Sequence, residues 1–256
     1  MEVVELDKIK RRFSRAAESY ERNAKAQKMI CEHLAALIDE VVGAEFNRLL
    51  EVGCGSGSLT KAMMRRLSIE KWVVNDLCES WRESIELALD STKHQFIVGD
   101  IESINIEGNF NIIASASALQ WIKDLPELFR KFSSMLTDDG LLAFNTYMPD
   151  NLHEIKALTG EGLHYPTKRE LLDWISERFE LLYEEDQTIQ LTFSSPLDVL
   201  RHLKRTGVTA NSSSVWTRGR QQRFCDDYID FFPSADGGVT LTYRPLYILA
   251  RRRMDK

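Results

Sequence analysis

The sequence predicts an α/β fold with a doubly wound, mostly parallel sheet, and three observations support this prediction. Short apolar runs alternate along the chain with segments in which apolar residues recur at helical spacing, as strands and helices do when they alternate. The apolar run that ends at Leu50 is followed by three closely spaced glycines and a helical pattern, which is the opening of a nucleotide-binding βαβ unit. The 256 residues are 43% hydrophobic and 28% charged, as in a globular chain large enough for one such domain.

The N-terminal part predicts helices, and the part after it predicts the strands of the sheet. Apolar residues recur at helical spacing from about residue 7 to residue 42, with a break at Asn23. Five further strands are expected, near residues 71–76, 94–100, 141–147 and 179–186, and in the first part of residues 110–122, where a loop follows the strand. Residues 188–193 are expected to extend the strand at 179–186. A seventh strand is expected over residues 241–252.

A helical insertion is expected before the last strand. Ser195 and Pro196 predict a helix start and Gly207 its end, because proline suits the first helical position and glycine the residue after the last. A further helix is expected from about residue 217 to residue 231. A connection of about 40 residues is long for a compact sheet, and such insertions are often lids.

The chain is therefore expected to be one domain over residues 1–256. Its parts are an N-terminal helical cap (1–44), a sheet core (45–194 and 239–256) and a helical lid (195–238).

The glycine turn carries the strongest chemical signal. Gly53, Gly55 and Gly57 stand at alternate positions, and Glu51 precedes the first by two. Glycine takes positive φ freely and lets a ligand approach the backbone. A dinucleotide fingerprint would place its third glycine at Ser58. The observed form instead resembles motif I of class I S-adenosylmethionine (SAM) methyltransferases, whose acidic residue and turn hold the methionine end of the cofactor. The alternative is any glycine-rich strand-to-helix turn.

Two acidic residues at later strand ends extend this cofactor hypothesis. Asp76 ends the second strand, where a carboxylate is placed to accept both ribose hydroxyls; the alternative is a helix N-cap. The resemblance implies that Asp100 reaches the adenine amino group with Ile101 beside the ring. Leu77, Ser115 and Gln27 complete the expected cofactor-binding set.

Four segments point to a narrower family. Residues 13–27, 118–125, 200–207 and 241–250 together resemble the malonyl-acyl-carrier-protein O-methyltransferases of biotin synthesis, and the resemblance runs nearly end to end. It implies a class I SAM-methyltransferase sheet with strand order 3-2-1-4-5-7-6, the seventh strand antiparallel. It also implies methyl transfer from SAM to the free carboxylate of a malonyl thioester on acyl carrier protein or coenzyme A.

The chain departs from the family pattern at three places. Asn111 stands where this fold more often has aspartate, Arg205-Thr206 where a small and an aliphatic residue are common, and Arg244 where a histidine is common. These departures concern the substrate pocket and leave the cofactor motif intact.

Candidates for acceptor recognition come from the predicted insertion. Arg201, Lys204 and Arg205 share one helix face beside an apolar stripe of leucines at 197, 200 and 203. Arginine suits bidentate carboxylate binding, so Arg201 is the first candidate and Lys204 the second; the alternative is a solvated face. Arg205 and three further arginines, Arg218, Arg220 and Arg223, are expected to meet an acidic carrier protein.

Two aromatic residues complete the expected catalytic set. By resemblance, Tyr20 closes over cofactor and substrate, with Gln27 as a second candidate there. Trp121 is expected to wall the methyl-transfer site, with core packing as the alternative.

The bulk composition excludes several other functions. A net charge of −6 and a pI near 5.5 argue against nucleic-acid binding. No apolar run reaches membrane-spanning length, the N-terminus lacks the pattern of a signal peptide, and four scattered cysteines indicate neither a metal site nor disulfides. A cytoplasmic enzyme is expected. Two alternatives stay open: methylation of another small acid or a quinone, and a SAM-binding regulator without catalysis. The sequence predicts no oligomeric state.

Overall fold

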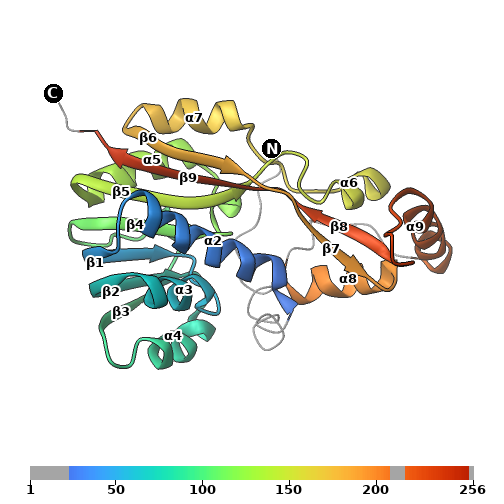
Figure 1. Cartoon of the computed structure of the whole chain (residues 1–256), viewed down its shortest axis with the longest axis horizontal. Coiled ribbons are helices and arrows are strands. Elements are labelled where there is room, and N and C mark those ends of the chain that lie inside the picture. The colour runs from blue at the N-terminus through green and yellow to red at the C-terminus, as the bar shows by residue number, and fades with distance from the viewer. Residues whose placement is uncertain (1–22, 208–216, 254–256) are drawn as a thin grey trace.

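The computed structural model describes residues 23–207 and 217–253, and a seven-stranded sheet forms its centre (Figure 1). The strands lie in the order β3-β2-β1-β4-β5-β9-β6. Strands β1 to β5 are parallel, whereas β9 runs antiparallel to both β5 and β6. The expected strand order, including the antiparallel strand, is therefore confirmed. The strands are β1 Glu45–Val52, β2 Ser68–Asp76, β3 Lys93–Val98, β4 Phe110–Ala116, β5 Leu136–Tyr147, β6 Phe179–Asp186 and β9 Pro245–Arg252.

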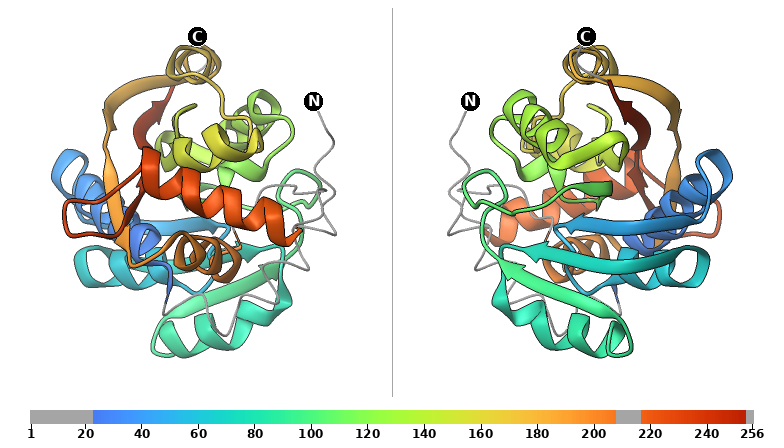
Figure 2. Two further views of the ribbon diagram at one scale, coloured as in Figure 1. Left: turned by 90° about the vertical axis from the view of Figure 1, so that its right-hand side faces the viewer. Right: turned by 90° about the vertical axis from the view of Figure 1, so that its left-hand side faces the viewer.

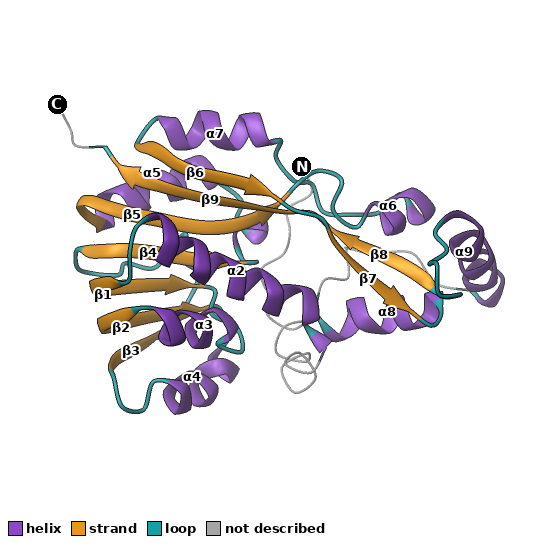
Figure 3. Cartoon of the chain, viewed as in Figure 1, coloured by secondary structure: helices purple, strands orange, loops and turns teal. Residues whose placement is uncertain are grey.

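Helices cover both faces of this sheet, as a doubly wound fold requires (Figure 3). One apolar core joins α2, α3 and α4 to one face, and a second joins α5 and α7 to the other. The α-helices of the described chain are α2 Lys25–Val41, α3 Ser58–Arg66, α4 Arg82–Ala88, α5 Leu125–Met135, α6 His153–Thr159, α7 Lys168–Ser176, α8 Pro196–Arg205 and α9 Arg218–Phe231.

The helix starts that the sequence predicts are confirmed by their hydrogen bonds. The Ser195 hydroxyl accepts from the Asp198 amide at 3.3 Å and begins α8. Thr167 and Glu170 cap each other reciprocally at the start of α7. The Thr217 hydroxyl accepts from the Arg220 amide and begins α9. These caps satisfy amide groups that have no partner within the helix.

The C-terminal strand differs from the sequence prediction. One strand was expected over residues 241–252, but β8 (Val239–Tyr243) and β9 are separate, with Arg244 between them. Strand β7 (Ile189–Phe193) pairs antiparallel with β8 in a sheet of its own. The prediction that residues 188–193 extend β6 within the main sheet is therefore wrong. Alternating apolar residues identify a strand but not the sheet it joins.

The β7–β8 ribbon carries the insertion away from the main sheet. The ribbon starts where β6 ends and β9 begins, and it extends to α8 and α9. These helices lie on the opposite side of the molecule from the C-terminus (Figure 1). Viewed from that side, α9 crosses in front with α8 below it (Figure 2). The two helices contact each other, and α6 contacts α9 and β8. The first of the expected N-terminal helices lies outside the described residues, together with Tyr20.

Candidate active site

A cavity lies at the carboxyl ends of the parallel strands, where ligands of open α/β sheets bind. Its walls are the glycine turn after β1, Asp76 and Leu77 at the end of β2, Asp100 and Ile101 after β3, and the loop after β4 as far as Ile122. About 130 Å³ of it is reachable by water. The strand-end residues that the sequence analysis selected after β2 and β3 are thus brought together here.

The glycines of the turn share a backbone conformation, but Gly53 and Gly55 differ in what lies beside them. All three have positive φ: 70° at Gly53, 50° at Gly55 and 77° at Gly57. A Cβ on Gly53 would lie 2.3 Å from the Cβ of Ala118, so this glycine lets the loop after β4 pass close to the turn. A Cβ on Gly55 would meet only open space within 4 Å. Gly55 therefore forms a cradle that a ligand, rather than the protein, would fill.

Asp76 ties the glycine turn to the end of β2. One of its carboxylate oxygens accepts from the Gly55 amide at 2.9 Å and the other from the Cys78 amide at 2.8 Å. Burial raises the pKa of Asp76, although these backbone hydrogen bonds act in the opposite direction. The carboxylate lines the cavity and caps no α-helix, since α4 begins after Trp81 without a side-chain cap.

Glu51 lies behind the glycine turn and does not line the cavity. The Thr60 hydroxyl donates to one of its carboxylate oxygens at 2.6 Å, and the other oxygen is buried without a partner in the described chain. Burial raises the pKa of Glu51 to about 8. A buried oxygen without a donor suits a nearby ligand cation or water.

Ser115, another expected cofactor residue, also does not line the cavity. It is fully buried in β4, and its hydroxyl donates to the Val52 carbonyl at 2.9 Å. Ser117 lines the cavity in its place, because β4 continues to Ala116 and only the following residues reach the strand end. Ser117 has a φ of 55°, and its amide donates to the Asn145 side chain at 2.8 Å.

A second, smaller cavity adjoins the first. The two share Gln27, Ser117 and Trp121. The second holds about 10 Å³ of water-reachable space, enough for one water molecule. Its other lining residues are Gln120, Tyr147, Asn151, Leu163, Tyr165, Thr206 and Tyr243, and none of these carries a formal charge at neutral pH.

The sequence analysis selected Gln27 and Trp121 but none of the other residues of the second cavity. Three of these residues, Asn151, Leu163 and Tyr165, lie in the connection between β5 and α7 that contains α6, and no periodicity in the sequence marks them as a pocket. Tyr243 belongs to one of the family-like segments, which is the one signal that would have drawn attention to it.

The basic candidates of α8 lie elsewhere. Arg201 and Lys204 are exposed, and Arg201 donates to the Asp198 carboxylate at 2.6 Å. The buried face of the helix carries Val199, His202 and Leu203, followed by Thr206. Of the leucine stripe expected at 197, 200 and 203, Leu203 is buried and Leu200 packs partly buried against the core. The structure therefore does not bring Arg201 or Lys204 to either cavity.

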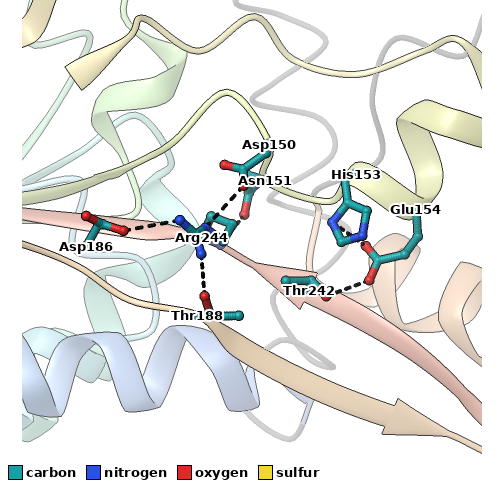
Figure 4. A network of polar contacts seen from close by, with 8 residues as sticks. All are labelled: Asp150, Asn151, His153, Glu154, Asp186, Thr188, Thr242 and Arg244. Atoms are coloured by element: carbon teal, nitrogen blue, oxygen red, sulfur yellow. Dashed lines mark hydrogen bonds and ion pairs between the residues drawn. The ribbon is translucent and has the colours of Figure 1, made fainter. Parts of the chain in front are cut away.

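Arg244 holds the junction between the two sheets. Its guanidinium lies between Asp150, at 3.3 Å, and Asp186, at 3.1 Å, and it also donates to the Thr188 hydroxyl (Figure 4). With these partners Arg244 fixes the point where β8 turns into β9, and it does not line the second cavity.

His202 and Tyr243 form a neutral pair beside the second cavity. The His202 Nε2 atom and the Tyr243 hydroxyl lie 2.8 Å apart. Burial, with a smaller contribution from the charge of Lys25, lowers the pKa of His202 to about 4. Elsewhere in the described residues, no group of three or more potential ligands is arranged to hold a metal ion. No helix in that part of the chain is long and apolar enough to cross a membrane.

Comparison with known structures identifies the fold. The structure resembles a putative methyltransferase from Bacillus halodurans, with a TM-score of 0.64 and 17% identity, over 86% of this chain and 99% of that one. It also resembles the N-methyltransferase NodS from Bradyrhizobium japonicum in complex with S-adenosyl-L-homocysteine, with a TM-score of 0.55 and 13% identity, over 93% and 99% of the two chains. These similarities confirm the class I methyltransferase fold.

Comparison with curated sequences identifies the family. Residues 50–144 match the methyltransferase domain family. The chain is 42% identical to a malonyl-[acyl-carrier protein] O-methyltransferase of Porphyromonas gingivalis, over 97% of this chain and 96% of that protein. It is 39% identical to a protein of the same name from Haemophilus influenzae, over 97% and 95%. The chain thus belongs to the malonyl-[acyl-carrier protein] O-methyltransferase family.

Proposed function

We propose that the chain transfers the methyl group of S-adenosyl-L-methionine to the free carboxylate of malonyl-acyl-carrier protein. The product is a methyl ester that fatty-acid synthesis elongates toward biotin. The observation that carries this proposal is the near full-length match to curated relatives of that name. The cavity at the strand ends offers room for a ligand, and the second cavity adjoins it at Gln27, Ser117 and Trp121.

The residues of the first cavity fit the cofactor. The open space beside Gly55 accommodates a ligand against the backbone, and Asp76 presents a carboxylate to ribose hydroxyls. Asp100 and Ile101 line the part expected to hold the adenine ring. The unpaired oxygen of Glu51 lies behind the turn, where it would attract the amino group of the methionine end through a water or a small shift. These roles are proposals that rest on position and residue chemistry.

The chemistry requires alignment rather than a base. When bound, S-adenosyl-L-methionine supplies a methyl group on a positively charged sulfur, which a carboxylate oxygen displaces with its own electron pair. A malonyl carboxylate is already ionised at pH 7, so no protein group needs to remove a proton. Trp121 lines both cavities and is therefore placed to orient the acceptor and exclude water. We retain Tyr20 as a further candidate for this closure.

The surface of α9 supports a docking site for the acidic carrier protein. Arg218, Arg220 and Arg223 occupy its N-terminal half, whereas Asp226, Asp227 and Asp230 occupy its C-terminal half. This order is unfavourable for the helix itself, because the helix dipole favours acidic residues at the N-terminus and basic residues at the C-terminus. Helix stability does not account for this distribution, which is consistent with a docking role. Arg201, Lys204 and Arg205 add exposed charge on the neighbouring α8.

Product formation tests the proposed function. Methyl transfer from labelled SAM is measured with malonyl-carrier protein, with malonyl-coenzyme A and with free dicarboxylic acids. Transfer to the malonyl thioesters is the expected result. Transfer only to free acids would indicate another small-acid methyltransferase, and tight SAM binding without any product would indicate a regulator.

Charge reversal tests the docking site. Arg218→Glu combined with Arg220→Glu should raise the Michaelis constant for malonyl-carrier protein about tenfold or more, and increasingly at low salt. Malonyl-coenzyme A should be little affected. The matched control reverses two exposed arginines of α3, Arg65 and Arg66, which carry the same charge far from the insertion. Equal losses in both pairs, or for both substrates, would place docking elsewhere.

A further inference from the structure

The second cavity raises a question about anion recognition, because its described walls contain no cation. A carboxylate that leaves water needs donors in exchange, and a buried charge without them is costly. Neutral hydroxyl and amide groups, together with the indole N–H of Trp121, are the donors that this cavity offers. Among the hydroxyl side chains, one has both a hydrogen-bond direction that the backbone fixes and a proton still available to donate.

That side chain is Tyr165, which is buried in the loop before α7 and lines the cavity. Its hydroxyl oxygen accepts a hydrogen bond from the Asn151 amide nitrogen at 2.9 Å. A phenol that accepts through oxygen still has its own proton to donate. No acceptor for that proton lies within residues 23–207 and 217–253.

The direction of this hydrogen bond is set by the backbone. The Asn151 side-chain oxygen accepts from the Arg244 amide at 3.0 Å, and a backbone amide can only donate (Figure 4). The asparagine must therefore turn its NH₂ group toward Tyr165. Arg244 is itself held between Asp150 and Asp186. The hydrogen bonds that run from the Arg244 amide through Asn151 to Tyr165 therefore start from a residue whose position is fixed.

Burial keeps the phenol a donor. It raises the pKa of Tyr165 to about 12, so the hydroxyl stays neutral throughout the working range of an enzyme. A neutral donor orients a carboxylate oxygen without pairing off its charge, which leaves the other oxygen nucleophilic.

The remaining polar atoms of the cavity favour the same placement. The side-chain oxygens of Gln27 and Gln120 are buried and have no partner in the described chain. They are acceptors, which suit water or an N–H group and repel a carboxylate. The donors of the cavity thus include the Tyr165 hydroxyl and, on the wall shared with the first cavity, the indole N–H of Trp121.

We propose that Tyr165 donates a hydrogen bond to the acceptor carboxylate and sets the preference for a malonyl group, with Asn151 as its positioning residue. This inference rests on the proposed function and names the side chain that recognises its substrate. A diacid one or two carbons longer would place its carboxylate past the fixed hydroxyl, so it should be methylated less well.

The first test removes the hydroxyl. Tyr165→Phe should lower kcat/KM for malonyl-coenzyme A by about 10- to 100-fold, the scale of a lost hydrogen bond to a charged group. SAM affinity should not change. The ratio of kcat/KM for the malonyl thioester to kcat/KM for the glutaryl thioester should fall toward one. A general loss of folding would lower both values and leave this ratio unchanged. The control is Tyr228→Phe, whose buried hydroxyl already donates to the Thr240 carbonyl at 2.8 Å, outside the cavity.

The second test reverses the donor chain. In Asn151→Asp the new carboxylate can only accept, so the Tyr165 hydroxyl should donate its hydrogen bond to that carboxylate instead of to the acceptor substrate. This variant should match Tyr165→Phe in kcat/KM, and the double variant should be no worse than either single one.

Two results would overturn the inference: a folded Tyr165→Phe protein that keeps both its malonyl rate and its chain-length preference, or additive losses in the double variant. Absence of methyl transfer by the wild-type protein would instead defeat the proposed function.

Discussion

The two cavities are built in different ways. Most walls of the first are strand ends and the loops after them, on four adjacent parallel strands of the main sheet, with Gln27 and Cys31 of α2 on one side. The second takes its walls from α2, the loop after β4, β5, the segment before α7, the end of α8, and β8. The first is built mainly along one edge of the main sheet, whereas the second forms only where segments distant in the sequence meet. The comparison teaches that cofactor binding and acceptor binding should be separable by substitution.

Of the substitutions that separate the two cavities, Asp76→Ala should give the largest effect, a loss of SAM affinity. It removes the carboxylate expected to accept from the ribose hydroxyls and frees the Gly55 and Cys78 amides. SAM affinity should fall by about 2–4 kcal/mol in calorimetry. The acceptor-side variant Tyr165→Phe should leave SAM affinity unchanged. An unaltered affinity in Asp76→Ala would remove the ribose assignment and break the division between the cavities.

Two alanine substitutions separate the structural from the ligand-binding glycine. Gly53→Ala places a Cβ against Ala118 at positive φ, so urea unfolding should show a loss of about 2–4 kcal/mol. Gly55→Ala meets open space, so it should cost only about 1 kcal/mol in stability. Its SAM affinity should nevertheless fall about tenfold. Normal SAM binding by Gly55→Ala would mean that the cofactor does not approach this turn.

Glu51, behind the first cavity, and His202, beside the second, should make the free energy of unfolding depend on pH in opposite directions. Folded Glu51, with its pKa raised to about 8, holds a proton that the unfolded chain releases near its ordinary pKa of 4.5. The contribution of Glu51 to the free energy of unfolding is complete below pH 4.5 and is lost as the pH rises to about 8. Folded His202, with its pKa lowered to about 4, stays neutral where the unfolded chain takes up a proton below about 6.5. Its contribution is lost as pH falls from 6.5 to 4.

Each slope should reach at most about 1.4 kcal/mol per pH unit in urea unfolding of the ligand-free protein. Glu51→Gln should flatten the loss at high pH, and His202→Gln the loss at low pH. An unchanged pH profile in either variant would mean that the corresponding group is not buried in its neutral form.

Arg201→Ala should give the smallest effect. Its guanidinium is paired with Asp198 and exposed, so the rate with malonyl-coenzyme A should change less than about threefold. Arg169→Ala, which removes another exposed ion pair on α7, serves as the control. A loss of two orders of magnitude in Arg201→Ala alone would restore it as the carboxylate clamp and displace Tyr165 from that role.

The sequence by itself determined the fold and the frame of the cofactor site. Alternating strand and helix patterns, the glycine turn and the acidic residues at strand ends each depend on a few consecutive residues. Parallel strands bring their carboxyl ends to one edge, so Asp76 and Asp100 could be placed together without coordinates. The same logic failed at Ser115, because the pattern could not show that β4 continues to Ala116.

Only the tertiary structure decided the second cavity. Helical spacing grouped Arg201 with Lys204 but could not show that α8 turns His202 and Thr206 inward. Nor could any local pattern relate Gln27 near one end of the chain to Tyr243 near the other. The physical reason is that helix and strand periodicities arise from local backbone geometry. A pocket between distant segments depends instead on how whole elements pack, and here the β7–β8 ribbon contributes Tyr243 to it.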